Sequence, residues 1–377
     1  MSRRSIGILS AADARNPRTW SGTTYFSCHA LEEYGAKITH LGPYPGNPWL
    51  YELIKNKVSR TLTGKGTNIY NTKRLSRKFS QYFTKVLADR SFDWLYAPAA
   101  AAETAFLETD IPIMGLSDAN HYLAQDYDSF RNLWQSSLEE FATIELRALH
   151  KFYKIAYPTS WVAQSTIHDL HIPSEKIFIA PFGANIVENE IPGFEQVVRT
   201  KKSDTCTLLF LGVDWERKGG AIAFNTLECL RSMNIPAELL ICGCMPPSGF
   251  THPHMKVIPF LDKRNKDDRY TIYSLLQSSS FLLLPTRAEA YGIVFCEASA
   301  FGLPSITSNV GGVSGVVIEE KNGHCLPYQS DGYDYAMVIR EIWEDEQRYC
   351  TLSQSSREQY EKRLNWRVWA ETVFRHM

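Results

Sequence analysis

Residues 286–298 read Thr-Arg-Ala-Glu-Ala-Tyr-Gly-Ile-Val-Phe-Cys-Glu-Ala, and they place Glu289 and Glu297 eight positions apart. An apolar run at 280–285 precedes them, and a Gly-Leu-Pro helix stop with a second apolar run at 305–307 follows them. This order predicts strand, loop, helix and strand, as in one unit of a parallel sheet. Glu289 then lies in the loop at the carboxyl end of a strand, the edge where open α/β sheets bind ligands. Glu297 is expected about two turns into the following helix.

Two carboxylates in this arrangement favour a ligand that is rich in hydroxyl groups. An ionised glutamate only accepts hydrogen bonds, and a sugar or a ribose offers paired O–H donors. The helix start between the two glutamates carries unpaired N–H groups that hold an anion. One strand–loop–helix unit therefore combines places for a polyol, a phosphate and a second polyol, which is the composition of a nucleotide sugar.

A basic loop lies upstream, where residues 211–219 read Leu-Gly-Val-Asp-Trp-Glu-Arg-Lys-Gly. Arg217 and Lys218 open the next predicted helix, and positive charges at a helix start oppose the helix dipole. A diphosphate gives these cations a reason to be there, because Arg binds phosphate through two hydrogen bonds and Lys acts as a point charge. The alternative is a solvated basic turn.

These stretches together resemble the retaining glycosyltransferases of family 4 (glycosyltransferase group 1). The spacing of Glu289 and Glu297 carries most of the resemblance, and the basic loop and weaker matches at 177–185 and 310–323 add to it. The resemblance implies the GT-B fold, an α/β architecture in which two Rossmann-like, doubly wound parallel-sheet domains face each other across a cleft. It also implies a retaining hexosyltransferase. Many members carry Arg at the position of Val213, so Arg217 is expected to take over that role here.

The resemblance also implies roles for single residues. Glu297 is expected to bind ribose hydroxyls, and Glu289 is expected to bind hydroxyls of the transferred sugar. The predicted donor-binding residues are Gly22, Thr23, Arg217, Lys218, Phe260, Leu261, Glu289, Tyr291, Gly292, Ile293, Val294 and Glu297. The residues predicted to act in catalysis are Glu289, Asp118, Lys218 and Arg217, and His121 is predicted to contact the acceptor or the sugar. No covalent nucleophile is assigned, and the family mechanism is a front-face attack in which the departing phosphate takes the acceptor proton.

Apolar runs and helical stretches alternate along the whole chain, which predicts parallel sheets flanked by helices. The expected strands of the first series are 5–10, 37–41, 94–97, 111–116, 155–157 and 177–180, and those of the second are 207–213, 238–242, 256–260, 281–284 and 305–307. Two series predict an N-terminal, acceptor-side domain over 1–187 and a nucleotide-sugar-binding domain over 205–351. A polar linker is expected between them, and the terminal helix at 352–377 is expected to cross back to the first domain, as in the family.

Two candidate sites lie in the first half. Gly22-Thr23 follows the first strand and precedes a helical stretch, where a glycine lets backbone approach a phosphate; a plain strand-to-helix turn is the alternative. Asp118 and His121 follow the strand at 111–116, near the position of a histidine that many family members place beside the donor sugar. Helix N-capping is the alternative for Asp118.

Composition excludes several classes of protein. The chain has 377 residues, is 44% apolar and 21% charged and has a net charge of −1, so nucleic acid is not an expected partner. Eight cysteines lack metal-site spacing, so buried free thiols in a reducing compartment are expected. No apolar run approaches the ~20 residues of a membrane span. The first residues are expected to form a strand and no signal peptide. A cytoplasmic enzyme of polysaccharide biosynthesis with no cofactor and no essential metal is expected.

Residues 51–90 form a basic segment with ten Lys or Arg against Glu52 and Asp89, interleaved with aromatic residues. Basic faces of this kind attract anionic membranes or acidic polymers. A peripheral contact with an anionic membrane, next to the acceptor side, is the functional hypothesis. A merely solvated helical face is the alternative.

The expected reaction moves a hexose from a nucleotide-diphosphate sugar to a hydroxyl of a glycan, a lipid-linked or a small-molecule acceptor. A nucleotide-sugar epimerase of the same fold would keep the donor site without an open acceptor groove. A non-catalytic sugar-binding protein would keep the fold and lose active-site groups. A nicotinamide-dependent oxidoreductase is disfavoured, because no Gly-x-Gly-x-x-Gly follows the first strand.

Overall fold

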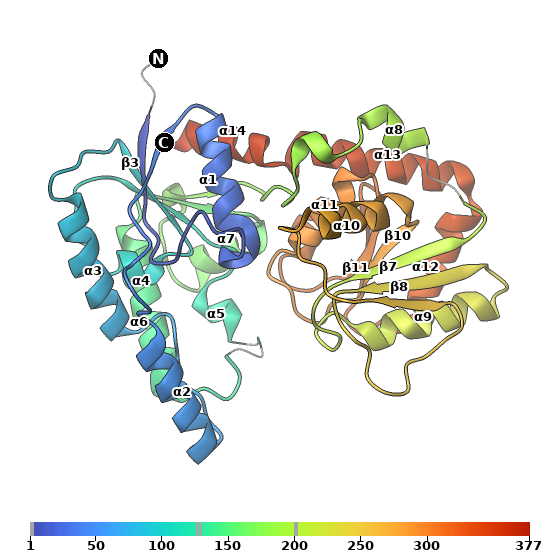
Figure 1. Ribbon diagram of the computed structural model, residues 1–377, viewed down its shortest axis with the longest axis horizontal. Coiled ribbons are helices and arrows are strands. Elements are labelled where there is room, and N and C mark those ends of the chain that lie inside the picture. Colours follow the sequence, from blue (N-terminus) through green and yellow to red (C-terminus); the bar gives the residue numbers. More distant parts are fainter. Residues whose placement is uncertain (1–3, 126, 128–129, 200–202) are drawn as a thin grey trace. The chain divides into compact units, whose positions relative to one another are not determined.

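The computed structural model describes residues 4–125, 127, 130–199 and 203–377 (Figure 1). The chain forms two compact units. Unit 1 comprises the residues up to Pro181 together with Trp369–Met377, and unit 2 comprises Phe182–Val368.

Unit 1 is built on a six-stranded parallel sheet in the order β2-β1-β3-β4-β5-β6. Its strands are β1 (Ser5–Ile8), β2 (Lys37–His40), β3 (Trp94–Pro98), β4 (Ile113–Leu116), β5 (Lys154–Tyr157) and β6 (Ile177–Ile179). All residues of β3 and β4 are buried. Strands that are covered on both faces read as continuous apolar runs, which is why the sequence located them well.

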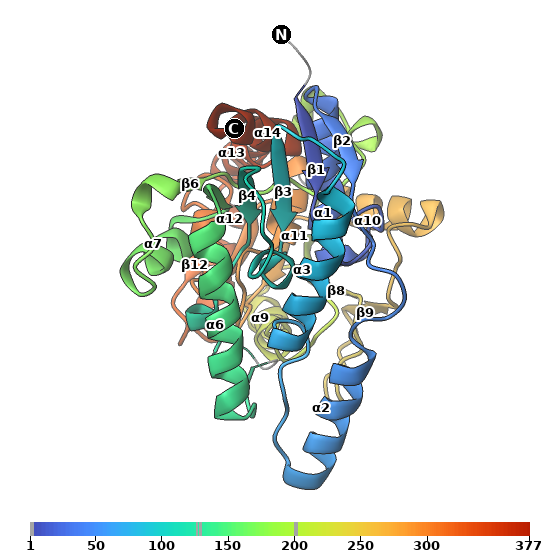
Figure 2. The same ribbon diagram turned by 90° about the vertical axis from the view of Figure 1, so that its left-hand side faces the viewer.

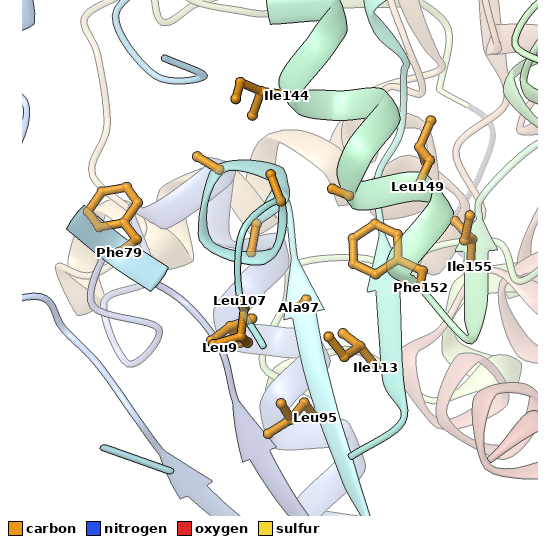
Figure 3. Packing of buried hydrophobic residues seen from close by; sticks show 14 of the residues in the cluster. Leu9, Phe79, Leu95, Ala97, Leu107, Ile113, Ile144, Leu149, Phe152 and Ile155 are labelled. Carbon is orange, nitrogen blue, oxygen red and sulfur yellow. The ribbon is translucent and has the colours of Figure 1, made fainter. Parts of the chain in front are cut away.

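Helices pack on both sides of this sheet. They are α1 (Thr23–Glu33), α2 (Leu50–Thr63), α3 (Lys73–Leu87), α4 (Ala101–Thr104), α5 (His121–Ala124), α6 (Gln135–Lys151), α7 (Ser160–His168) and the end of α14 (Trp366–His376). Figure 3 shows how the core forms where Phe79 of α3 and Ile144 and Leu149 of α6 lie over the side chains of β3, β4 and β5. The chain end is held by Trp369, whose ring centroid lies 6.0 Å from that of Tyr96.

Unit 2 repeats this architecture with the parallel order β12-β11-β10-β7-β8-β9. Its strands are β7 (Cys206–Leu211), β8 (Ala237–Cys242), β9 (Met255–Ile258), β10 (Phe281–Leu284), β11 (Ser305–Ser308) and β12 (Gly323–Leu326). Its helices are α8 (Phe194–Arg199), α9 (Gly220–Ser232), α10 (Lys266–Ser278), α11 (Ile293–Ala300), α12 (Gly332–Glu344) and α13 (Glu346–Arg363). Two parallel six-stranded sheets with flanking helices are the fold class that the sequence predicted.

The unit boundary lies before the linker that the sequence suggested. Phe182 already packs in unit 2, with ring centroids 5.0 Å from Tyr291 and 5.8 Å from Trp366. The stretch 187–199 packs on unit 2 as well: the Val187 N–H donates to the Tyr273 hydroxyl at 2.9 Å, and Val197 is buried. This stretch is therefore part of unit 2 although its sequence is polar. Residues 200–202 of the predicted linker lie outside the described residues.

The last stretch, expected as one helix over 352–377, is two helices. α13 ends at Arg363, and Asn365 begins the next helix by accepting the Val368 N–H on its side chain at 2.9 Å. In the part of the chain that the structure describes, no helix has the length and apolarity needed to cross a bilayer.

Candidate functional site

The site of unit 2 forms where two loops are joined at the carboxyl edge of the sheet. One loop follows β7 and the other follows β10. The Arg287 N–H donates to the Arg217 carbonyl at 2.7 Å, and the Arg217 guanidinium donates back to the Ala288 carbonyl at 3.0 Å. Gly219 has a φ of +76°, and a Cβ there would overlap the carbonyl of Pro285. Only glycine lets the loops approach this closely.

This joining brings both predicted cations to the predicted carboxylate. The Lys218 ammonium forms an ion pair with Glu289, and the Arg217 Nη1 lies 3.5 Å from the same Glu289 oxygen. Lys218 is only 8% exposed. Gly212 leaves room for its stem, because a Cβ at Gly212 would lie 3.0 Å from the Lys218 Cγ. The three charged residues that the two sequence motifs singled out therefore form one cluster in the structure.

The second carboxylate has a partner that the sequence did not suggest. Glu297 is buried as the fifth residue of α11, slightly more than one turn in and nearer the helix start than expected. It forms an ion pair with Lys263 from the loop between β9 and α10. Lys263 stands 34 positions before Glu297, so no local spacing links the two residues.

The start of α11 lies between the two ion pairs along the chain. Gly292 caps the helix with a φ of +88° and provides no side-chain cap, and Ile293 and Val294 form the first turn half-buried. Backbone N–H groups at such a helix start favour negative charge. The side chain of Tyr291, which was predicted to bind the nucleotide sugar, is buried. Its hydroxyl donates a hydrogen bond to the Phe182 carbonyl at 2.8 Å. Burial raises the pKa of Tyr291 well above its ordinary value, so this hydroxyl stays a donor.

Three other positions that the sequence singled out lie at the surface of unit 2. Phe260 is 62% exposed, and Leu261 beside it is half-buried, both in the loop that carries Lys263. Val213, at the position where many family members have Arg, is 64% exposed. Arg217 is the guanidinium that this chain brings to Glu289.

The first-half candidates lie in unit 1. Gly22 ends a turn in which Trp20, Ser21 and Gly22 all have positive φ, and it caps α1 without a side-chain hydrogen bond. Thr23 is the buried first residue of α1. Such backbone is strained for residues with side chains, and strained backbone of this kind clusters at functional sites.

Asp118 lies on the wall of a cavity of about 210 Å³ at the carboxyl ends of β3 and β4. Apolar side chains form most of the wall, and Ser117, Asn120 and Glu145 add polar groups. Asn120, not Asp118, caps α5, because its side chain accepts the Leu123 N–H at 3.0 Å. The capping alternative for Asp118 is therefore wrong.

His121 is hydrogen-bonded to a side chain of unit 1, that of Glu145. It is buried, and its backbone N–H and its Nδ1 each lie 2.6 Å from one oxygen of Glu145. The sequence did not identify Glu145, which reads as an ordinary outward glutamate of α6. Among the residues that the structure describes, no three His, Cys, Asp or Glu side chains gather as a metal site would require.

A model of the family described as glycosyl transferases group 1 matches residues 194–359, within unit 2. Residues 194–359 of unit 2 are therefore similar to the group 1 glycosyltransferases. The D-inositol 3-phosphate glycosyltransferase of Corynebacterium urealyticum is 25% identical over 210 residues, 51% of this chain and 48% of that protein. That of Corynebacterium glutamicum is 22% identical over 71% of this chain and 67% of its own length. The chain thus spans about half of the first relative's length.

Solved structures of low sequence identity share the fold of the whole chain. Sucrose-phosphate synthase from Thermosynechococcus elongatus matches with a TM-score of 0.68 at 16% identity, over 99% of this chain and 98% of that chain. Anabaena Alr3699/HepE, in complex with UDP and glucose, matches with a TM-score of 0.64 at 13% identity, over 99% of both chains. The GT-B fold that the sequence resemblance implied is confirmed.

Proposed function

We propose that this protein is a retaining hexosyltransferase that moves a hexose from a nucleoside diphosphate sugar to an acceptor hydroxyl. One observation carries the proposal: Arg217 and Lys218 converge on Glu289 at the mouth of the β10 loop, immediately before the capped start of α11. Cations and unpaired N–H groups suit a diphosphate, and a carboxylate among them suits sugar hydroxyls. The complexes of Anabaena Alr3699/HepE with UDP and with UDP-glucose support a nucleotide sugar as the donor.

Each charged group has a separate task in this proposal. Glu289 accepts hydrogen bonds from hydroxyls of the transferred hexose. Arg217, Lys218 and the N–H groups at Gly292–Ile293 stabilise the diphosphate as it leaves, because preorganised donors act most strongly where charge develops in the transition state. Glu297, held by Lys263, accepts from the ribose hydroxyls.

The bond changes follow from retention. The bond between the anomeric carbon and the diphosphate oxygen breaks, and the acceptor oxygen bonds to that carbon on the same face. The acceptor proton passes to the departing phosphate oxygen. The acceptor is proposed to bind unit 1 at the cavity beside Asp118, whose mostly apolar wall with a few polar groups is the usual lining of a small-molecule site.

Incubation with UDP-, GDP-, ADP- and dTDP-sugars without acceptor tests the reaction class. A transferase slowly releases free sugar with retained anomeric configuration, because water takes the place of the acceptor. An isomerised donor would identify an epimerase instead. Binding without any turnover, with or without an acceptor mixture, would identify a sugar-binding protein.

Variants then test the site. We expect Glu289→Gln to reduce transfer at least about 100-fold while nucleoside diphosphate still binds. Lys218→Met is expected to weaken nucleoside diphosphate binding about 10- to 100-fold and to leave nucleoside binding unchanged, because the lost contact is to phosphate. The exposed residues Glu344 and Lys256 provide the matched controls, Glu344→Gln and Lys256→Met. Full transfer by Glu289→Gln would remove Glu289 from the site.

A further inference from the structure

Helix α2 (Leu50–Thr63) of unit 1 meets the rest of its unit through polar side chains. Glu52 is buried and forms an ion pair with Arg74 at 2.7 Å. Asn56 accepts the Thr67 N–H at 2.8 Å, and Ser59 accepts the Trp134 indole N–H at 3.0 Å. The inward face of α2 is therefore held by an ion pair and hydrogen bonds, and the one residue of this fully described helix that is buried is Glu52, where a surface helix normally buries apolar side chains.

The apolar side chains of α2 point outward. Ile54 is 56% exposed and Leu62 is 77% exposed, and Leu50, Tyr51, Leu53 and Val58 are exposed as well. At about 100° per residue, Leu50, Ile54, Val58 and Leu62 fall within an arc of about 120°. We call these four residues the α2 stripe. Tyr51 falls in the same arc, and its ring contacts Arg74 of unit 1, whose guanidinium carbon lies 4.5 Å from the ring centroid. Figure 2 shows that α2 projects from the sheet of unit 1, so the stripe lies along a protruding helix.

The neighbouring helix α3 (Lys73–Leu87) provides an internal comparison. It has the ordinary arrangement, in which Leu75, Phe79, Phe83 and Leu87 are buried in the core and its cations other than Arg74 are exposed. Phe79 and Phe83 of the basic segment are thus core residues, whereas Tyr51 of α2 and Tyr70 of the loop that follows α2 are exposed. Contiguous exposed apolar surface of this kind marks an interaction site.

The charges around the stripe identify the partner. At about 100° per residue, Lys57 and Lys55 lie about 20° beyond the two edges of the stripe, and Arg60 follows on the Lys57 side. Lys55, Lys57 and Arg60 are exposed. In α2, every residue of which the structure describes, the only acid is Glu52, and it is buried against Arg74. Apolar residues flanked on both sides by cations match the boundary between acyl chains and anionic headgroups of a lipid bilayer.

We propose that α2 lies in the surface of an anionic lipid bilayer, with the stripe among the acyl chains and Lys55, Lys57 and Arg60 at the headgroups. The polar hydrogen bonds of Glu52, Asn56 and Ser59 hold the helix to unit 1 while its apolar face is in lipid. This membrane contact does not depend on the reaction proposed for unit 2.

Co-sedimentation with vesicles tests the contact, using phosphatidylcholine vesicles with and without phosphatidylserine at low and at physiological salt. We expect binding to the anionic vesicles and a loss of binding as salt rises, because screening shortens the range of the charges. Hydrogen exchange of the peptide over α2 should slow when these vesicles are present. Binding to neutral vesicles alone, or none to either kind, would overturn the proposal.

Two triple variants separate the stripe from the charges. Ile54→Ser with Val58→Ser and Leu62→Ser should lower the partition constant at least about tenfold. Lys55→Gln with Lys57→Gln and Arg60→Gln should lower it about 100-fold at low salt. The matched control for charge replaces three exposed lysines of unit 2, Lys256, Lys321 and Lys362, by Gln and should leave binding within threefold.

The stripe variants change exposed side chains, so circular dichroism should show an unchanged fold. If both α2 variants bind vesicles as the wild type does, α2 is not the contact. If instead the wild type is a dimer without lipid and the stripe variant is a monomer, the stripe is an interface between copies of this chain. Either result overturns the bilayer assignment.

Discussion

Replacing Glu103 by Gln should stabilise unit 1 at neutral and alkaline pH. Glu103 lies buried on α4, and its carboxylate accepts the Ala11 N–H at 2.8 Å. Burial raises the pKa of Glu103 from 4.5 to about 7. Glutamine keeps an oxygen that accepts the Ala11 N–H, and it brings no charge into the interior.

The shift in pKa sets the size and the pH window of the effect. Below pH 4.5 the carboxyl is protonated in both the folded and the unfolded state, so burial costs no charge. As pH rises from 4.5 to about 7, the unfolded state loses its proton while the folded state keeps it, and stability falls. At 1.36 kcal/mol for each pKa unit, the loss is about 3 kcal/mol above pH 7. Glu103→Gln should recover an amount of this order at pH 8 and almost nothing at pH 4.5.

Urea unfolding at pH 4.5, 6, 7 and 8 measures the difference between wild type and variant. Hydrogen exchange of the peptides over β3 and β4 follows unit 1 separately, because two compact units need not unfold together. The difference between the two proteins cancels the titration of all other groups. A difference that is the same at pH 4.5 and at pH 8 would refute the reasoning.

Three further predictions concern unit 2. Gly219→Ala should lower its unfolding free energy by at least about 2 kcal/mol, because the Cβ is strained at positive φ and meets Pro285; an unchanged urea midpoint would show that the loops separate freely. Excess chelator should leave turnover of the nucleotide sugar unchanged, and activity that vanishes and returns with Mn²⁺ would contradict metal independence. Arg217→Ala should weaken nucleoside diphosphate binding about 10- to 100-fold in calorimetry, and adding Val213→Arg should restore it in part, whereas no recovery would mean that position 213 does not reach the diphosphate.

The sheets were predictable because their signals are local. Strands such as β10, with all four residues buried, read as apolar runs, and each expected strand has its counterpart in the structure. β12 (Gly323–Leu326) was missed because Gly-His-Cys-Leu has no apolar run and the strand lies at the sheet edge, next to β11. Its register depends on Gly323, where a Cβ would overlap the carbonyl of Ser305.

The site was predictable only in part, because its ion pairs join residues that are distant in sequence and not all of these residues stand in a recognisable motif. Glu289, Arg217 and Lys218 stand in motifs with characteristic spacing, and the structure brings them together. Lys263 has no such motif, and only the fold carries it to Glu297. The outward stripe of α2 escaped prediction for a related reason: an amphipathic pattern shows that a helix has two faces, and the rule that apolar faces point inward selects the wrong one here.

The buried ion pairs affect how any variant of this site must be interpreted. Lys218 is almost fully buried beside Glu289, so removing Glu289 leaves a buried charge without this partner, and removing Lys218 leaves Glu289 with Arg217 alone; both changes are costly whether or not a ligand ever touches the pair. A loss of activity in Lys218→Met alone therefore combines a missing phosphate contact with a disturbed carboxylate. The neutral pair Lys218→Met with Glu289→Gln removes both charges together. On the proposed function this double variant folds as the wild type does and still binds diphosphate about 10- to 100-fold more weakly. If it binds diphosphate normally, the cluster holds the two loops together and Lys218 contacts no phosphate.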